Sequence, residues 1–218
     1  MIEVIGDRGR RRRYDPNLAE KVNREFKEGK LTPNVQLTVD ADIEKICRGY
    51  EGFMKLDRDK EFMRSEGESV IPTKITDKFR PTKNQILKFS KILVKYKDLD
   101  KFNDTVNYLT ALMHSSEDDE FLIDLTKLSE AGVLLNYVGY GLENKKLTVN
   151  GDVGACFGMC AQDCKIIANK NAGRDFGHAS IECEIYVKGD IKNISDNIGE
   201  GTRIYQEKEG EWKQIYPK

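Results

Sequence analysis

Histidine and tryptophan are scarce in this sequence of 218 residues, which contains two histidines, His114 and His178, and one tryptophan. A mechanism built on a histidine base or a histidine-rich metal site therefore has little material. No run of about 18 apolar residues occurs, which excludes a membrane-spanning helix. Residues 1–13 lack the apolar core of a signal peptide. The 36 basic and 37 acidic residues nearly cancel, so the chain as a whole is not built to bind nucleic acid. These absences predict a cytoplasmic protein with no membrane partner.

The five cysteines are an odd number, which does not suit a disulfide framework. Cys156, Cys160 and Cys164 follow a C-x3-C-x3-C spacing, and Cys183 comes later in the chain. Structural zinc sites usually use C-x2-C pairs, which this sequence lacks, and no histidine follows at ligand spacing. We therefore expect no metal and no other cofactor. These four cysteines would be the candidate ligands if a metal were bound.

A basic cluster, RGRRRR at residues 8–13, is the strongest local departure from neutrality. Clustered guanidinium groups neutralise phosphates, so residues 1–14 are interpreted as a basic arm for nucleic acid or another anionic partner. The alternative is a solvated terminal tail, because several glutamates soon dilute the charge. The arginines of the arm are Arg8, Arg10, Arg11, Arg12 and Arg13.

Residues 15–118 are predicted to form a mostly α-helical domain. The signals are capping residues followed by apolar positions three or four apart. Helices are expected at four places: after Asp15, after Asp40, after Thr82, and from about residue 104 to 114. A short strand is expected at 35–39 and an extended connection at 57–81. The apolar stripes of these helices are read as core-facing, and the region contains no cofactor motif.

The second half of the chain repeats every 19 residues, the mark of a repeat architecture. One column of the repeat is aliphatic: Leu128, Leu147, Ile166, Ile185 and Ile204. Two places further on, the column is apolar in the middle and polar at both ends: Glu130, Val149, Ala168, Val187 and Gln206. Two more columns are mostly apolar: Leu134, Val153, Ala172 and Ile191, and then Val138, Phe157, Phe176 and Ser195. Glycines share the register: Gly139, Gly158 and Gly177 in one column, and Gly132, Gly151 and Gly189 in another.

A period of 19 residues is too short for a helical hairpin and suits one coil of a β-solenoid. Coils stacked in parallel at about 4.8 Å turn each aliphatic column into a ladder that fills the interior. Glycine supplies the backbone angles that tight turns need, and the polar residues Glu130 and Gln206 suit terminal coils. The predicted fold class is therefore α+β, with an α-rich region followed by a short parallel β-helix at 119–206 and a C-terminal tail at 207–218.

Several pieces of this region match a known family. They are NYVG at 136–139, LTVNGDVG at 147–154, NAG at 171–173, FG at 176–177, IYV at 185–187 and IGEG at 198–201. With them, residues 120–206 resemble the GXGXG domain, the β-helix at the C-terminus of the large chain of glutamate synthase that also occurs in formylmethanofuran dehydrogenases. The resemblance implies a right-handed parallel β-helix with a structural role, because in glutamate synthase-like enzymes this domain braces catalytic domains and contributes no catalytic group.

The sequence departs from the family pattern at two kinds of position. Asn144, Asp163 and Glu182 stand where the family tends to have a glycine, and the last coil has Ser195 in place of an aromatic residue. Residues 1–115 resemble neither catalytic domain of glutamate synthase, and no phosphate loop or Rossmann fingerprint is present. These departures indicate a diverged β-helix of about four coils.

Three functions follow as hypotheses. The favoured one is a non-catalytic scaffold or accessory protein that docks in a larger, oxidoreductase-type complex through a protein partner or a second copy of the chain. The first alternative is a nucleic-acid-associated protein that uses the arginine arm, for which salt-steep binding is expected. The second alternative is a small enzyme with a site between the two halves, for which the chain offers no recognisable nucleophile motif.

Three local features each allow two interpretations, one as a functional site and one as an ordinary structural residue or turn. Cys164 and Cys183 occupy equivalent places in adjacent coils, within disulfide reach, and are either a redox-sensitive surface pair or, as we favour, small residues in a stacked turn. His178 is either a general base or, as we favour, an exposed turn residue. The acidic turn at 117–120 is a cation site or, as we favour, a solvated turn, because the ligand spacing of a calcium loop is missing.

Overall fold

The structure is a computed structural model that describes residues 3–5, 11–13, 41–55 and 79–217. The chain divides into two compact units, residues 1–41 and 42–218. In the first unit, strand β1 (Glu3–Ile5) pairs antiparallel with β2 (Arg11–Arg13). The helix expected after Asp15, the strand expected at 35–39 and most of the connection at 57–81 lie outside the described residues.

Most helices of the second unit precede its sheet in the chain. They are α2 (Ala41–Met54), α5 (Lys83–Ile92), the 3-10 helices η1 (Leu93–Tyr96) and η2 (Phe102–Asp104), and α6 (Thr105–Ser115). Thr82 begins α5 with a capping box, in which its N–H donates to the side chain of Gln85 at 2.7 Å. The three helices predicted for this part of the chain are thus confirmed. No helix among the described residues is long and apolar enough to span a membrane.

Aromatic side chains hold these helices together. The rings of Tyr50, Phe89 and Tyr108 meet with centroids 5.4 to 5.7 Å apart, and all three side chains are buried. The buried hydroxyl of Tyr108 donates to the carbonyl of Ile46 at 2.9 Å, and that of Tyr50 lies 2.7 Å from the hydroxyl of Thr105. Because both polar tips are satisfied, the tyrosines serve as core residues.

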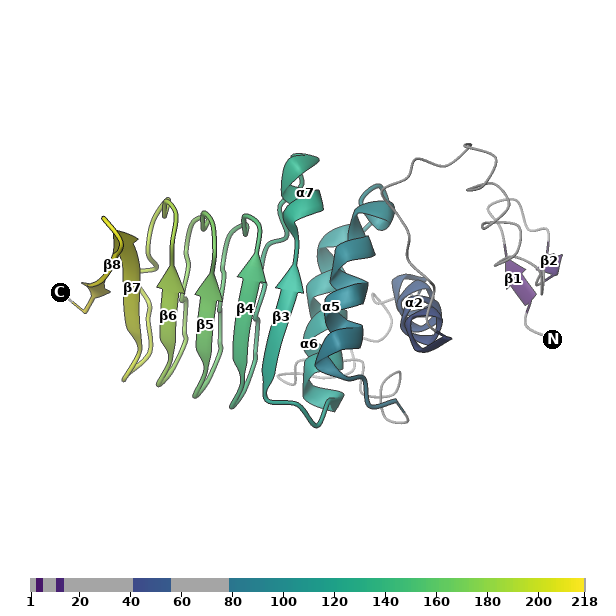
Figure 1. The fold of residues 1–218 in the computed structure, drawn as a ribbon, viewed down its shortest axis with the longest axis horizontal. Helices are drawn as coiled ribbons and strands as arrows, with labels where there is room; N and C mark the ends of the chain where they lie inside the picture. The colour runs from purple at the N-terminus through teal and green to yellow at the C-terminus, as the bar shows by residue number, and fades with distance from the viewer. Residues whose placement is uncertain (1–2, 6–10, 14–40, 56–78, 218) are drawn as a thin grey trace. The chain divides into compact units, whose positions relative to one another are not determined.

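A six-stranded sheet runs through the rest of the unit, in the order β3-β4-β5-β6-β7-β8 (Figure 1). Its strands are β3 (Glu120–Asp124), β4 (Lys146–Asn150), β5 (Lys165–Ala168), β6 (Glu184–Val187), β7 (Arg203–Lys208) and β8 (Glu211–Tyr216). Strands β3 to β7 pair in parallel, and between β4 and β7 each residue pairs with the one 19 places further along. The predicted α+β class and the parallel β-solenoid with 19-residue coils are confirmed.

The predicted ladders fill the interior of the solenoid. Leu147, Ile166, Ile185 and Ile204 lie in register on successive strands and are completely buried. In the fourth column, the rings of Phe157 and Phe176 stack with centroids 6.4 Å apart, and Val138 is buried at its first end. The prediction for its other end was wrong, because Ile194 rather than Ser195 pairs with Phe176, although Ser195 is buried next to it. Isolated parallel bridges join Val153, Ala172 and Ile191 in the third column. The outer polar position of the second column, Gln206, closes its ladder by donating to the carbonyl of Gly189 at 2.9 Å.

The prediction for the first rung was wrong. Phe121 and Ile123 of β3, rather than Leu128 and Glu130, pair with Leu147 and Val149. Leu128 is buried but belongs to a short helix, α7 (Thr126–Glu130), which lengthens the first coil relative to the others. The 19-residue spacing of Leu128 from Leu147 therefore does not reflect stacking. Leu134 also stays outside its column's bridges and is 43% exposed.

Left-handed backbone angles recur at fixed positions of the coils. Gly139, Gly158 and Gly177 have φ of 79°, 69° and 75°, as expected for turn glycines. The positions before each strand are left-handed too, although three of them carry other residues: Asn144, Asp163 and Glu182, followed by Gly201. The backbone thus keeps the glycine-type turn where the side chain departs from the family pattern. The remaining predicted glycines, Gly151 and Gly189, lie against neighbouring backbone that an added Cβ would meet at 2.9 Å or less.

Both ends of the solenoid are closed by other structure. At the first end, α5 packs on β3, and the N–H of Asp124 donates to the hydroxyl of Ser90 at 2.8 Å (Figure 1). At the other end, the segment expected to be a tail forms β8, which pairs antiparallel with β7 through an irregularity near Tyr205. Charged residues and a bulge discourage further strand pairing, so β8 ends the stack.

Candidate functional site

The outward face of the sheet carries an apolar column, here called the outer stripe. Its members occupy the same outward register position on β3 to β7: Leu122, Thr148, Ile167, Tyr186 and Tyr205. Side chains on a strand alternate between faces, so these residues stand directly between the buried interior positions. Leu122 is 36% exposed and the other four are half-buried. Apart from Thr148 the column is apolar, and an apolar column on the outside of a sheet favours an interaction surface.

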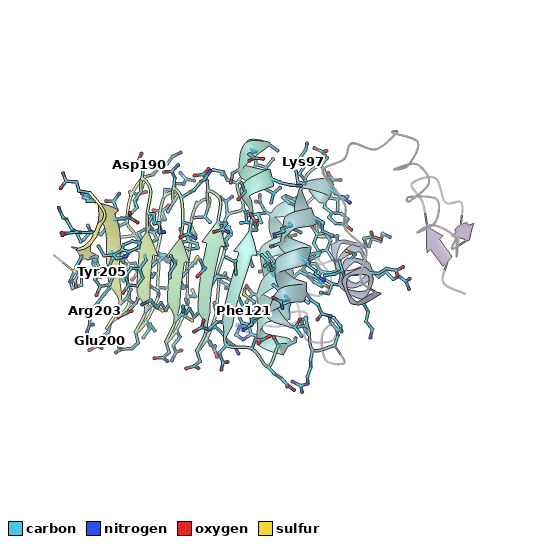
Figure 2. All side chains as sticks on the ribbon, viewed as in Figure 1. Lys97, Phe121, Asp190, Glu200, Arg203 and Tyr205 are labelled. Atoms are coloured by element: carbon cyan, nitrogen blue, oxygen red, sulfur yellow. The ribbon has the colours of Figure 1, made fainter. Side chains whose placement is uncertain are left out.

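Aromatic rings dominate one end of the stripe. Tyr186 and Tyr205 stack with centroids 4.7 Å apart and planes within 11° of parallel, and Trp212 of β8 meets Tyr186 edge-on at 5.0 Å. The ammonium group of Lys165 lies 4.6 Å from the Tyr186 ring centroid, a cation–π contact. Trp212 remains 41% exposed. Figure 2 labels Tyr205 on β7, near this end of the sheet.

The Tyr186 hydroxyl is fixed by its surroundings. It donates to a carboxylate oxygen of Glu184 at 3.0 Å. Burial, reinforced by this hydrogen bond, raises the pKa of Tyr186 to about 12. The ring is therefore neutral throughout the physiological range, and its contribution to the stripe is that of an apolar surface with one satisfied polar tip.

Polar columns border the stripe on both sides. On one side, Lys146 pairs with Glu120 at 3.2 Å and Lys165 pairs with Glu184 at 3.4 Å. Arg203 completes this border on β7 (Figure 2), so the border holds three basic and two acidic residues. On the other side, the amide of Asn169 donates to that of Asn150 at 2.8 Å. An apolar centre within a polar rim is the usual anatomy of a protein interface.

Of the candidate metal-ligating cysteines, the structure brings together Cys164 and Cys183 alone. Cys160 is exposed, Cys156 is half-buried, and Cys164 and Cys183 are buried. Within the described ranges, no group of three or more histidine, cysteine, aspartate or glutamate residues is placed to hold a metal ion.

Cys164 and Cys183 are interior residues, so the interpretation as a surface pair was wrong. The thiol of Cys164 donates to the carbonyl of Leu142 at 3.1 Å, and at the same position of a later coil the hydroxyl of Thr202 donates to Ser180 at 2.9 Å. The two cysteines therefore act as small turn-sealing residues, as threonine does. A hydrogen bond with the Cys164 thiol, together with burial, raises the pKa of Cys183.

This burial predicts a graded thiol reactivity. With a small alkylating reagent on the native protein, we expect Cys160 to react first, Cys47 and Cys156 more slowly, and Cys164 and Cys183 only as the solenoid opens, because the reagent cannot reach a buried thiol until the structure opens locally. Mass spectrometry of digested samples over time would follow each site, with all five thiols reacting in denaturant as the control. Rapid labelling of Cys183 in the native state would contradict the placement.

The other sequence candidates have structural partners. His178 is half-buried rather than exposed as expected, and its Nδ1 lies 2.9 Å from the hydroxyl of Ser195, a bond between neighbouring coils. Basic residues pair with the acidic turn: the ammonium of Lys83 lies 3.8 Å from Asp118, which also accepts from the backbone N–H of Lys83 at 2.8 Å, and Asp119 pairs with Lys145 at 2.8 Å. Of the arginine arm, the structure describes the backbone of Arg11–Arg13 in β2, whereas Arg8 and Arg10 lie outside the described residues.

Comparison with known proteins shows no match to this chain, whether among family models, curated proteins or solved structures. The outer stripe was not among the residues singled out from the sequence. Its signal is nevertheless present, since Thr148, Ile167, Tyr186 and Tyr205 share the 19-residue period one place after the aliphatic column. Once the structure shows that the aliphatic column faces inward, the column one place after it must face outward, and the same pattern then predicts an apolar exterior.

Proposed function

We propose that this chain is a non-catalytic scaffold or accessory protein that docks a protein partner on its outer stripe. The observation that supports the proposal is the stripe itself, an apolar and aromatic column on the outward face of a sheet whose inward face is already packed. Tyrosine and tryptophan contribute strongly to binding at protein interfaces, and Tyr186, Tyr205 and Trp212 are packed against one another here. A stacked ladder of strands offers the partner a stiff platform that loses little entropy on binding.

The class of partner is proposed from the sequence resemblance. Residues 120–206 resemble the GXGXG domain, whose role in glutamate synthase-like enzymes is to brace catalytic domains. By analogy, the partner would be a component of an oxidoreductase of the glutamate synthase or formylmethanofuran dehydrogenase type. The chemistry would then belong to the partner, and this chain would contribute position and rigidity.

Affinity capture of the full-length protein from its native extract tests the proposal. We expect wild-type protein to retain an oxidoreductase component and Tyr205→Ala to retain at least tenfold less, because an anchoring aromatic side chain typically contributes about 2 kcal/mol or more to binding. Leu99→Ala is the control, since Leu99 is an apolar residue that is 41% exposed but lies outside the sheet. Bound proteins would be identified and quantified by mass spectrometry.

Two results would contradict this function. Equal capture by wild type and Tyr205→Ala would remove the stripe from the interface. Recovery of nucleic-acid-binding proteins alone, abolished by nuclease and high salt, would favour the arginine arm instead.

A further inference from the structure

We infer, building on the docking role proposed above, that the outer stripe receives an amphipathic α-helix of the partner, lying across the strands. The stripe runs perpendicular to β3–β7, with one residue contributed by each strand. A partner element must therefore follow the stacking direction of the coils to cover it. The two regular elements that could do so differ in how well their side-chain spacing matches the rungs.

Spacing favours a helix. Successive rungs of the sheet lie about 4.8 Å apart. A helix presents side chains on one face about every 5.4 Å, at positions i, i+3 or i+4, and i+7. Over the four intervals of the stripe the mismatch accumulates to about 2–3 Å, which side-chain flexibility absorbs. An extended strand presents same-face side chains about every 6.7 Å, so it drifts by about 8 Å, more than one full rung, over the same distance.

The borders of the stripe specify the flanks of the helix. The border that contains Lys165 and Arg203 has an excess of one basic residue, and Arg203 stands beside the aromatic end of the stripe. Carboxylates on that flank of the partner helix would be complementary in charge, while leucine or other large apolar residues cover Ile167 and Tyr186. The occupant is thus a helix with an apolar face and an acidic flank.

Trp212 provides a reporter, because it is the only tryptophan and sits 5.0 Å from Tyr186, edge-on to its ring. The probe is a synthetic peptide of about 18 residues without tryptophan, with leucines at helical spacing and glutamates on one flank, long enough to be helical and to cover the stripe. A control peptide has the same composition with leucines at alternate positions. We expect the helical peptide to shift the Trp212 emission to the blue in a saturable titration of the full chain, and to bind at least tenfold more tightly than the control.

Variants place the binding on the stripe. Ile167→Glu and Thr148→Glu should each weaken binding of the helical peptide tenfold or more, whereas Leu99→Glu should leave it unchanged. Thr148 is included because its side chain takes no part in interior packing. Equal binding of the two peptides, or binding that Ile167→Glu and Thr148→Glu do not affect, would overturn the inference. If a partner is captured through the stripe but neither peptide binds, the inference of a helical occupant is overturned and the proposed function still stands. Capture that does not depend on Tyr205 would overturn the proposed function itself.

Discussion

Ile166→Ala is expected to lower the free energy of unfolding by about 3 kcal/mol, within the usual range for truncating a buried isoleucine. Ile166 is completely buried and lies in register between Leu147 and Ile185. Its methyl group also fills the space over Gly158, where an added Cβ would lie 3.3 Å from it. The neighbouring coils pack on the same side chain and are held in place by the sheet, so they cannot collapse to fill the resulting cavity. The loss of stability therefore includes both the lost transfer free energy and the cost of the cavity.

Ile167→Ala is the matched control, because Ile167 is the next residue on the same strand and points outward to the stripe. We expect it to change the free energy of unfolding by about 1 kcal/mol or less, mostly through strand propensity. Urea titration of both variants, followed by circular dichroism and Trp212 emission, measures the difference. An equal effect of the two substitutions, or a larger effect at Ile167, would mean that the strand's two faces are assigned the wrong way round.

The interior of the solenoid could be predicted from sequence because stacking imposes a strict chemical period. Leu147, Ile166, Ile185 and Ile204 must each be large and aliphatic, since each packs on its neighbours in the column. Glycines at the turns carry the same period because the backbone there is left-handed. A repeated physical requirement therefore leaves a repeated residue type, and the fold class follows from it.

The ends of the solenoid could not be predicted in the same way, because the requirement for stacking residues does not extend beyond the stacked coils. At the first coil, α7 interrupts the spacing, so that Phe121 rather than Leu128 meets Leu147. At the last, β8 reverses direction and has no equivalent in any other coil. Elements that occur once leave no period, and their positions depend on tertiary packing.

The left-handed turns show a second limit of sequence reasoning. Cys156 and Cys160 have φ of 58° and 55°, so their spacing reflects turn positions shared with Asp175 and Ala179 of the next coil. A pattern that resembles a ligand cluster thus arises from backbone geometry. The residues at these positions adopt a strained left-handed conformation that the stacked coils impose. Within the described part of the chain, the cysteines form no metal-binding group.

The second large effect is expected at a glycine that the neighbouring coil crowds. A Cβ added at Gly173 would lie 2.5 Å from the carbonyl carbon and oxygen of Gly154, and both partners are backbone. The N–H of Gly173 also donates to the carbonyl of Val153 at 3.1 Å, which fixes the separation of the two coils. Gly173→Ala must therefore push adjacent coils apart or distort the turn, and we expect it to lower the free energy of unfolding by about 3 kcal/mol.

Gly52→Ala separates this effect from the intrinsic consequence of replacing a glycine. Gly52 lies in α2, is exposed, and has no atom within 4 Å of an added Cβ. Alanine there should raise the free energy of unfolding by about 0.5–1 kcal/mol, because it restricts the unfolded chain and favours the helix. Opposite signs at the two positions, measured by chemical denaturation under one set of conditions, would show that close stacking of the coils selects Gly173. A neutral Gly173→Ala would instead indicate that the coils can separate at this turn, and the stiffness on which the docking platform depends would then be in doubt.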